Sequence, residues 1–398
     1  MRPGDTEKRR RGKIEPEVQK TDRAAPSPGF DSDSRINWNT VSRVLIVRLR
    51  SIGDTVLATP SLTALKRLMP EAQIDILLED WVAPLLDGFD AVDNVISIPQ
   101  SWVSRIQTAW RLRQNKYDVA INLHGGTTGT FFTFASGAKH RVGYAEYQYN
   151  FLYNHLLSSS SDFWRLESTH SAEQQLALLG FVGVPVEDRP GSRLAVTSSA
   201  IESLSRKFHA KAQRPQSEDE AVGTAGASGW PNFGGYVLFH PAAAFATKMW
   251  AIDNFARTAE FLFEKGMQTV AVAARNETAL LEGLVAAANV PVITFNDLTL
   301  PEITALASKA LLFVGNDSGI AHIAAAVSTP TVVIFGSSNR DHWRPWTDAP
   351  NEIVYEKLPC QPCPGYDCRE FGEPKCIISV RPEAVFDAIG KVINNRAS

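Results

Sequence analysis

The most informative segment of the chain is Phe313-Val-Gly-Asn-Asp-Ser-Gly-Ile-Ala-His322, where a hydrophobic strand gives way to a helix of small residues. Asn316 or Asp317 can cap that helix, and Ser318 and Gly319 let backbone N–H groups approach an anion closely. The pattern indicates a turn that binds phosphate. It fits an ordinary capped helix equally well, so other segments must separate the two interpretations.

Length and composition limit the class of protein. The 398 residues favour two domains, and an apolar content of 44% is typical of a globular protein. Lysine and arginine total 40 against 43 aspartates and glutamates, which argues against a protein that wraps nucleic acid. No region resembles an RNA- or DNA-binding module, so we expect no nucleic-acid partner.

The amino-terminal residues 1–36 are rich in charged residues, proline and serine and have almost no apolar pattern, which predicts a disordered tail. The Arg9-Arg10-Arg11 cluster can contact anionic lipid, although a solvated tail explains it as well. No apolar segment follows it, so the sequence predicts neither a signal peptide nor a transmembrane anchor. We therefore expect a cytoplasmic protein.

The polar segment over residues 207–235 is typical of a flexible linker. On both sides of it, predicted strands alternate with predicted helices. This alternation predicts an α/β protein with parallel sheets in two Rossmann-like domains, over 42–206 and 236–380, that face each other across a cleft. Ligands then bind beyond the carboxyl ends of the strands. The expected strands cover 44–47, 74–78, 95–98 and 118–123 in the first domain and 236–239, 269–273, 291–294, 311–314 and 331–335 in the second. The expected helices include 104–115, 253–264, 277–288, 301–309 and 318–327.

Three strand ends carry side chains suited to chemistry. Asp54 follows the first strand and can act as a general base, although it can also simply cap the next helix. Lys248 stands in a loop of small residues where it can neutralise a diphosphate, unless it is an ordinary surface lysine. His322 follows the turn at 315–319 and is either a ligand contact or a buried core histidine. No G-x-G-x-x-G fingerprint follows the first strand, which weighs against a nicotinamide enzyme.

Taken in order, these segments resemble glycosyltransferase family 9, the heptosyltransferases of the lipopolysaccharide inner core. The resemblance covers about residues 42–392. It is carried by Val44-Leu-Ile-Val-Arg-Leu-Arg-Ser-Ile-Gly-Asp54, the loop from His240 to Trp250, Gly315-Asn-Asp-Ser-Gly-Ile-Ala-His322 and Pro330-Thr-Val-Val-Ile-Phe-Gly336. It implies the GT-B architecture, an inverting transfer from ADP-heptose and no metal in catalysis. It also implies that the carboxy-terminal helix, within residues 381–398, crosses back to the first domain.

The resemblance implies roles for individual residues. Asp54 matches the catalytic aspartate, and Lys248 matches the lysine that contacts the donor diphosphate. The donor-binding turn corresponds to Asn316, Asp317, Ser318, Gly319 and His322, and Glu277 occupies a loop near the donor nucleoside. Ala242-Ala-Ala244 departs from relatives that have paired hydroxyl residues there, so donor contacts in this loop must come from the backbone.

The acceptor implied by the resemblance is a phosphorylated lipid sugar, which needs cations on the first domain. The candidates are Arg48, Arg50, His124, Lys139 and Arg141. His124 lies in a glycine-rich loop that can instead be a tight turn. The basic helix over 105–116 is a further candidate, although a solvated helix face explains it as well.

All four cysteines lie in one loop, as Cys360-x2-Cys363-x4-Cys368-x7-Cys376. The cluster is compact enough for a tetrahedral structural metal, yet a reduced or partly disulfide-linked loop explains it equally well.

The sequence thus predicts an inverting glycosyltransferase that moves heptose from ADP-heptose to a lipopolysaccharide core acceptor, associated peripherally with the cytoplasmic face of the membrane. One alternative is a family 9 transferase with another nucleotide sugar. Another is a binding protein for sugar nucleotides without catalysis, which the presence of Asp54 and Lys248 argues against.

Overall fold

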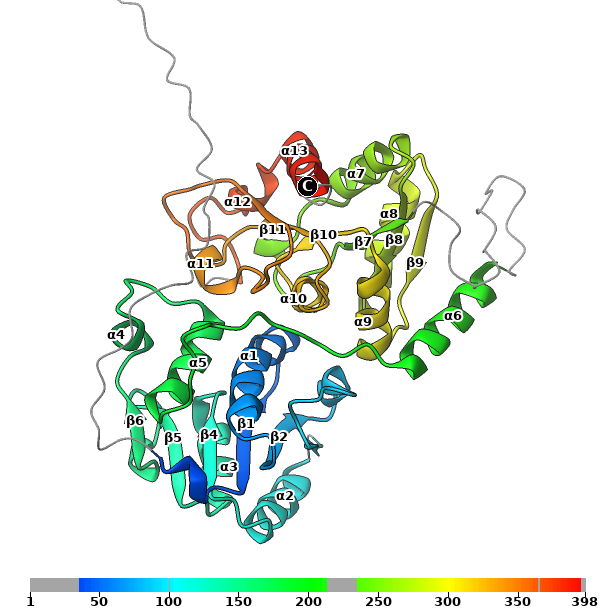
Figure 1. The fold of residues 1–398 in the computed structure, drawn as a ribbon. Coiled ribbons are helices and arrows are strands. Elements are labelled where there is room, and N and C mark those ends of the chain that lie inside the picture. The colour runs from blue at the N-terminus through cyan, green and yellow to red at the C-terminus, as the bar shows by residue number, and fades with distance from the viewer. Residues whose placement is uncertain (1–35, 100, 213–234, 364–365, 395–398) are drawn as a thin grey trace, which may run out of the picture.

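The computed structural model describes residues 36–99, 101–212, 235–363 and 366–394, which form two lobes built around two parallel sheets (Figure 1). All but the last residue of the predicted tail and most of the predicted linker lie outside these ranges. Both lobes alternate strands and helices, so the predicted α/β class with two Rossmann-like domains is confirmed.

The first lobe holds a six-stranded parallel sheet in the order β3-β2-β1-β4-β5-β6. Its central strands are almost wholly buried because helices cover both faces, as their continuous apolar runs require. The strands are β1 (Arg43–Leu49), β2 (Gln73–Glu79), β3 (Asn94–Ile98), β4 (Val119–Asn122), β5 (His140–Tyr144) and β6 (His155–Leu157). The helices are α1 (Ile52–Leu68), α2 (Trp102–Gln114), α3 (Gly126–Ala135), α4 (Ser160–Trp164) and α5 (Ser171–Phe181).

The second lobe repeats the arrangement, with strand order β12-β11-β10-β7-β8-β9. The strands are β7 (Tyr236–His240), β8 (Gln268–Val272), β9 (Val292–Phe295), β10 (Leu312–Asn316), β11 (Thr331–Phe335) and β12 (Asn351–Tyr355). The helices are α6 (Ser198–Ala212), α7 (Ile252–Glu264), α8 (Thr278–Ala287), α9 (Leu300–Lys309), α10 (Gly319–Ala326), α11 (Arg340–Trp343), α12 (Lys375–Ile378) and α13 (Pro382–Asn394). Across the described part of the chain, no helix combines the length and apolarity needed to cross a membrane.

The chain passes between the lobes before α6, in the extended segment that follows α5 (Figure 1). There the backbone N–H of Arg193 donates to Thr59 of the first lobe, and that of Leu194 donates to Ala326 of the second. Helix α6 then packs on α9, where Lys207 pairs with Glu302 at 2.9 Å. Residues 198–206, which the sequence boundary assigned to the first domain, therefore pack with the second lobe, and the helix extends into the predicted linker.

The carboxy-terminal helix α13 packs on the second sheet, against β11, β12 and α7. Its apolar face, which includes Val385, Ile389 and Val392, is buried in the core of that lobe. The expected return to the first lobe is therefore wrong for residues 382–394.

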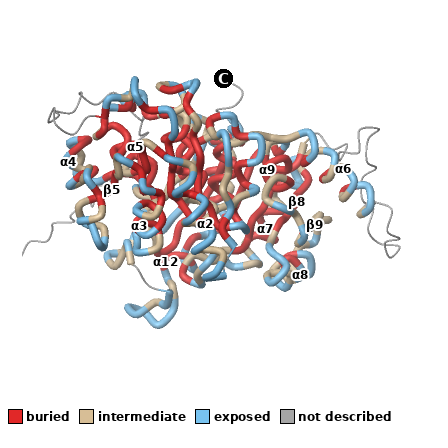
Figure 2. The backbone as a smooth tube through the Cα atoms, turned by 90° about the horizontal axis from the view of Figure 1, so that it is seen from below, coloured by how far each residue is buried: buried red, intermediate tan, exposed pale blue. Residues whose placement is uncertain are grey.

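Helices α1 and α10 pack directly on each other and join the two lobes. Two glycines allow this approach: a Cβ on Gly319 would come within 2.7 Å of Ile52, and one on Gly53 within 2.9 Å of the His322 ring. The main hydrophobic core runs through the contact and contains Val56 of α1 and Ile323 of α10. Buried backbone accordingly continues through the middle of the molecule in Figure 2.

Candidate active site

The turn after β1 has an unusual backbone that aims two charged side chains at each other. Leu49 and Ser51 both have positive φ values, of 63° and 69°, which are uncommon for residues other than glycine. The β1–β2 register also shifts between Val47 and Leu49. Such irregularities concentrate at functional sites, because the surrounding structure must hold them in place.

Asp54 lies in the first turn of α1, and its carboxylate is held on two sides. One oxygen forms an ion pair with Arg48, and the other accepts a 2.6 Å hydrogen bond from the Ser51 hydroxyl. Ser51 is the N-cap of α1, so Asp54 is not the capping residue. The Asp54 side chain remains 23% exposed, whereas that of Arg48 is only 6% exposed. The carboxylate is therefore fixed in orientation yet open to the cleft.

Arg48 also fixes the tautomer of His124. Its guanidinium donates to the carbonyl of Leu123 at 3.0 Å and lies 3.3 Å from Nδ1 of His124. Arginine can only donate, so Nδ1 accepts and the ring proton is on Nε2. Burial and the nearby charges of Arg48 and Arg50 lower the pKa of His124 to about 4. At neutral pH His124 is therefore an uncharged group with one N–H left to donate.

On the opposite lobe, Lys248 forms a 2.8 Å ion pair with Asp317, which also accepts a hydrogen bond from Ser338. Asp317 is 6% exposed, so it orients the ammonium group and does not cap α10. Asn316 does not cap it either, because its side chain bonds the N–H of Trp250 and the carbonyl of Pro241. The helix begins at Gly319 with Ser318 as its N-cap, and no side chain caps it.

Two buried histidines complete this region. The Nδ1 atom of His240, at the end of β7, lies 3.0 Å from the Ser318 hydroxyl, and burial lowers the pKa of His240 to about 4. His322 is 4% exposed, and its Nδ1 atom has no hydrogen-bond partner among the described residues. Burial also lowers the pKa of His322, although Asp317 and Asp54 oppose that shift. Both rings are therefore neutral at pH 7.

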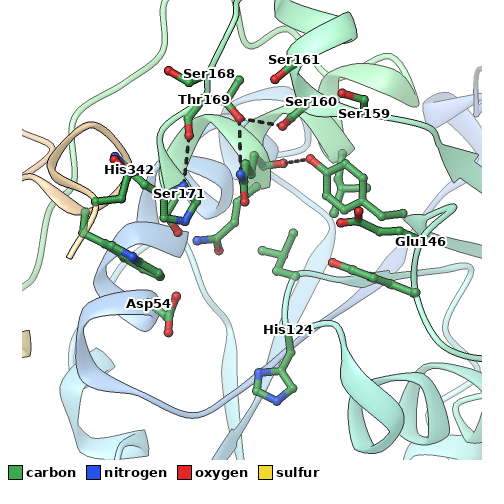
Figure 3. A pocket seen from close by; sticks show the side chains of 18 of the residues that line it. Asp54, His124, Glu146, Ser159, Ser160, Ser161, Ser168, Thr169, Ser171 and His342 are labelled. Atoms are coloured by element: carbon green, nitrogen blue, oxygen red, sulfur yellow. Dashed lines mark hydrogen bonds between the residues drawn. The ribbon is translucent and has the colours of Figure 1, made fainter. Parts of the chain in front are cut away.

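Two cavities meet at Asp54. The first, of about 660 Å³, lies between the lobes and includes Lys248, Asp317, Ser318, Gly319 and His322 in its lining. The second, of about 540 Å³, lies mainly on the first lobe beneath α4 and α5 and is drawn in Figure 3. Asp54 and Trp343 line both cavities, so a group bound in one can reach a group bound in the other at this carboxylate.

The structure brings together most of the predicted donor residues. Asp54, Lys248, Glu277, Asp317, Ser318, Gly319 and His322 all line the cavity between the lobes. Asn316 is fully buried behind it and supports the loop that carries Lys248. The Glu277 carboxylate accepts from the N–H of Ala274 at 3.0 Å, which fixes it on the cavity wall.

The predicted acceptor residues are only partly brought together. Arg48 and His124 line the second cavity, but Arg50 is exposed and lines neither one. The expectation is wrong for Lys139 and Arg141, because they lie where β5 begins, at the end of the sheet away from the cleft. Arg141 is instead held by the carbonyls of Leu152 and Ala138.

The polar residues of the second cavity were missed by sequence reasoning. They come from two serine-rich stretches, 158–161 and 168–171, and from the first turns of α5. The run of four serines after Leu157 was a visible signal. It reads as an ordinary loop unless the strand before it is recognised.

The cysteine loop lies beside the second lobe, where the N–H of Cys363 donates to the carbonyl of Ser337. All four cysteines are free, as in the reduced form of the loop. Among the described residues, which do not include 364 and 365 of this loop, no group of three or more His, Cys, Asp or Glu side chains is arranged to hold a metal ion. The structural metal therefore stays a hypothesis, which metal analysis of the purified protein tests.

Comparisons with known proteins agree with this geometry. The family model described as Glycosyltransferase family 9 (heptosyltransferase) matches residues 105–372, more than half of the chain. Lipopolysaccharide heptosyltransferase 3 of Escherichia coli K12 is 27% identical over 378 residues, covering 87% of this chain and 96% of the relative. Lipooligosaccharide heptosyltransferase 2 of Haemophilus ducreyi is 26% identical over 319 residues, covering 76% of this chain and 86% of the relative.

Solved structures show the same fold. A family 9 glycosyltransferase from Veillonella parvula superimposes with a TM-score of 0.73 at 16% identity, covering 91% of this chain and 99% of that one. The ADP-heptose lps heptosyltransferase II of E. coli gives a TM-score of 0.69 at 20% identity, covering 89% of this chain and all of that one. The chain therefore belongs to glycosyltransferase family 9 and is a glycosyltransferase of the GT-B architecture.

Proposed function

We propose that this enzyme transfers heptose from ADP-heptose to a sugar of the lipopolysaccharide inner core, with inversion at the anomeric carbon. The names of the relatives support the reaction, and a related E. coli heptosyltransferase has been solved with ADP-2-deoxy-2-fluoro heptose. The single observation that carries the proposal is that Asp54 lies where two cavities meet, one facing Lys248 and the other lined by hydroxyl groups.

Asp54 is positioned to act as the general base. Its carboxylate accepts the proton of an acceptor hydroxyl as that oxygen forms a bond to the anomeric carbon of the donor. The bond from that carbon to the diphosphate breaks on the opposite face, so the configuration inverts and ADP leaves with the electron pair. Base catalysis of this kind contributes about 10²- to 10⁴-fold. Arg48 and Ser51 keep the carboxylate oriented while this happens.

Charge on the departing diphosphate is balanced by groups of the second lobe. Lys248 is held at the cavity wall by Asp317, and the first-turn N–H groups of α10 lack partners within the helix. A fixed cation and oriented backbone dipoles stabilise developing negative charge without reorganising. We propose that these groups serve the reaction without a metal cofactor.

We also propose that the enzyme works at the cytoplasmic face of the membrane, attached peripherally. Exposed aromatic and aliphatic side chains gather on α2, α3 and the adjoining turn at 149–151, a surface that we call the aromatic face. It comprises Trp102, Val103, Ile106, Trp110, Phe131, Phe134, Tyr149 and Phe151, and Arg105, Arg111, Arg113 and Arg141 lie on the same elements or beside them. Aromatic rings beside arginines suit the headgroup region of an anionic bilayer.

The proposal is tested by incubating the protein with ADP-heptose and with other nucleotide sugars, each with and without a deacylated core oligosaccharide. We expect ADP release that depends on both ADP-heptose and the acceptor, and an NMR spectrum of the product that shows the inverted anomer. Faster turnover with another nucleotide sugar would favour a different family 9 transferase. Donor binding without any release would favour a binding protein.

A further inference from the structure

The second cavity is lined mainly by groups that form hydrogen bonds without carrying charge. Of its 20 lining residues, nine carry hydroxyl groups and three carry carboxamides. Hydroxyls and amides both donate and accept, as the hydroxyls of a saccharide do. Figure 3 shows Ser159, Ser160, Ser161, Ser168, Thr169 and Ser171 along one side of the cavity, with Asp54 and His124 on the other.

The charged groups of this cavity disfavour an anion. Among the described residues that line it, Arg48 is the only lysine or arginine, and it is already engaged by Asp54, Leu123 and His124. Asp54 and the exposed Glu146 contribute carboxylates. Burying a phosphate next to two carboxylates without a free cation costs desolvation and like-charge repulsion.

One buried acceptor in the cavity wall still lacks a donor. Gln175, in α5, is 5% exposed, and its Oε1 atom has no hydrogen-bond partner in the part of the chain that the structure describes. A buried carbonyl oxygen left unpaired is energetically unfavourable, so such atoms are rare unless a ligand or water satisfies them. Gln175 also lines the cavity, so we infer that its side chain turns this oxygen towards a ligand hydroxyl when the cavity is filled.

The neighbouring hydroxyls are held in place before any ligand binds. The hydroxyls of Ser160 and Thr169 lie 2.8 Å apart (Figure 3). Tyr144 donates to the carbonyl of Gln174 at 2.6 Å. His342, from the second lobe, bonds the carbonyl of Thr169 at 3.1 Å. A fixed array of hydroxyls recognises a rigid ring with defined hydroxyl positions at a low entropic cost.

We propose that this cavity binds the acceptor sugar that receives the transferred residue, and that this sugar carries neither phosphate nor carboxylate. Phosphates elsewhere on the lipid sugar then lie outside the cavity. The assignment of the cavity to the acceptor rests on the proposed function. The chemical class of its ligand, an uncharged polyhydroxylated ring, follows from the lining itself.

The test compares two synthetic acceptors, a heptose disaccharide and the same disaccharide with one phosphate monoester on its non-reducing sugar. Binding of each is measured by calorimetry in the presence of ADP, and turnover by release of ADP from ADP-heptose. We expect the uncharged disaccharide to bind at least about tenfold more tightly than the phosphorylated one. Equal or tighter binding of the phosphorylated disaccharide, or no binding of either one, would overturn the inference.

A variant pair links this preference to the cavity wall. Gln175→Met removes the unpaired oxygen at nearly constant volume and should weaken binding of the uncharged disaccharide roughly 3- to 10-fold, with ADP binding unchanged. Ser61→Ala is the matched control, because its hydroxyl is also buried without a partner among the described residues but does not line the cavity. An equal effect of both substitutions would count against the inference. Selective binding without transfer of any sugar would retain the inference and reject the proposed function.

Discussion

Asp54 combines two properties that a catalytic base needs, a fixed orientation and access to the cleft. Its partner Arg48 is buried and donates to three groups on two loops, so it stays in place when substrates enter. The usual objection to a carboxylate in an ion pair is that the pair is structural. Here the aspartate side chain is 23% exposed and lines both cavities, which a purely structural pair would not require.

Replacing Asp54 with asparagine should lower kcat by about 10²- to 10⁴-fold, because the amide cannot accept the proton. Donor affinity should stay close to wild type, since the amide oxygen can still accept from Arg48. Both are measured by ADP release and by calorimetry with ADP. Asp188→Asn is the matched control, because Asp188 also pairs with an arginine, Arg67 at 2.5 Å, but neither residue lines a cavity described above. Retained turnover in Asp54→Asn, with a normal melting temperature, would reject the base assignment.

Lys248→Ala should weaken ADP binding roughly 10- to 100-fold and lower turnover as well, because it removes a charge-assisted contact to the diphosphate. Lys265→Ala is the control, since Lys265 lies over the Phe261 ring on the surface. A thermal melt of Lys248→Ala separates weaker binding from the cost of leaving Asp317 unpaired. Unchanged ADP affinity in a folded variant would contradict the role of Lys248.

For individual residues, the sequence was most informative in the turns and loops that follow a strand. Asp54, Lys248 and Asp317 could be predicted because hydrophobic runs mark their strands clearly. Lys139 and Arg141 were misplaced because strand β5, which carries a histidine and an arginine, was not recognised as a strand. Gln175 could not be predicted at all, since its significance depends on a missing partner in the folded structure.

Among the elements, the contact between α1 and α10 is the one that sets the position of the site. It brings the Asp54 turn against the turn at 315–319, and Gly53 and Gly319 make the approach possible. Sequence analysis predicted a helix after each of the two turns, but not that the two helices would pack on each other. Short elements such as β6 and α4 were missed, because three to five residues give too little periodicity to recognise.

Gly319→Ala should destabilise the protein by about 1–3 kcal/mol, because the added methyl group overpacks the contact with Ile52. The loss is measured by chemical denaturation, and activity should fall with it because the lobes are pushed apart. Gly390→Ala in α13 provides the control, because none of the described residues places an atom within 4 Å of its new Cβ beyond the helix itself. Helix propensity should therefore leave stability unchanged or raise it by up to about 1 kcal/mol. Equal effects of the two substitutions would show that α1 and α10 do not pack this closely in solution.

For the whole molecule, the two lobes place three surfaces in a fixed relation. The first cavity lies between the lobes, the second, hydroxyl-lined cavity opens on the first lobe, and the aromatic face lies on that same lobe. Tyr147 lines the hydroxyl-lined cavity, and Tyr149 and Phe151 follow it in the chain. The sequence predicted two lobes and a cleft, but the neighbouring positions of the hydroxyl-lined cavity and the aromatic face depend on tertiary packing.

This arrangement predicts that the enzyme binds anionic vesicles through the aromatic face. In a flotation assay, wild-type protein should bind vesicles that contain phosphatidylglycerol more tightly than neutral phosphatidylcholine vesicles, and added salt should weaken the binding. Trp102→Ser combined with Trp110→Ser should reduce binding at least about tenfold, since the two rings are 71% and 64% exposed on one side of α2. Phe263→Ser is the matched control, because Phe263 is 47% exposed on α7 of the other lobe. If the double variant floats like wild type, or if Phe263→Ser lowers binding equally, the aromatic face is not the membrane contact.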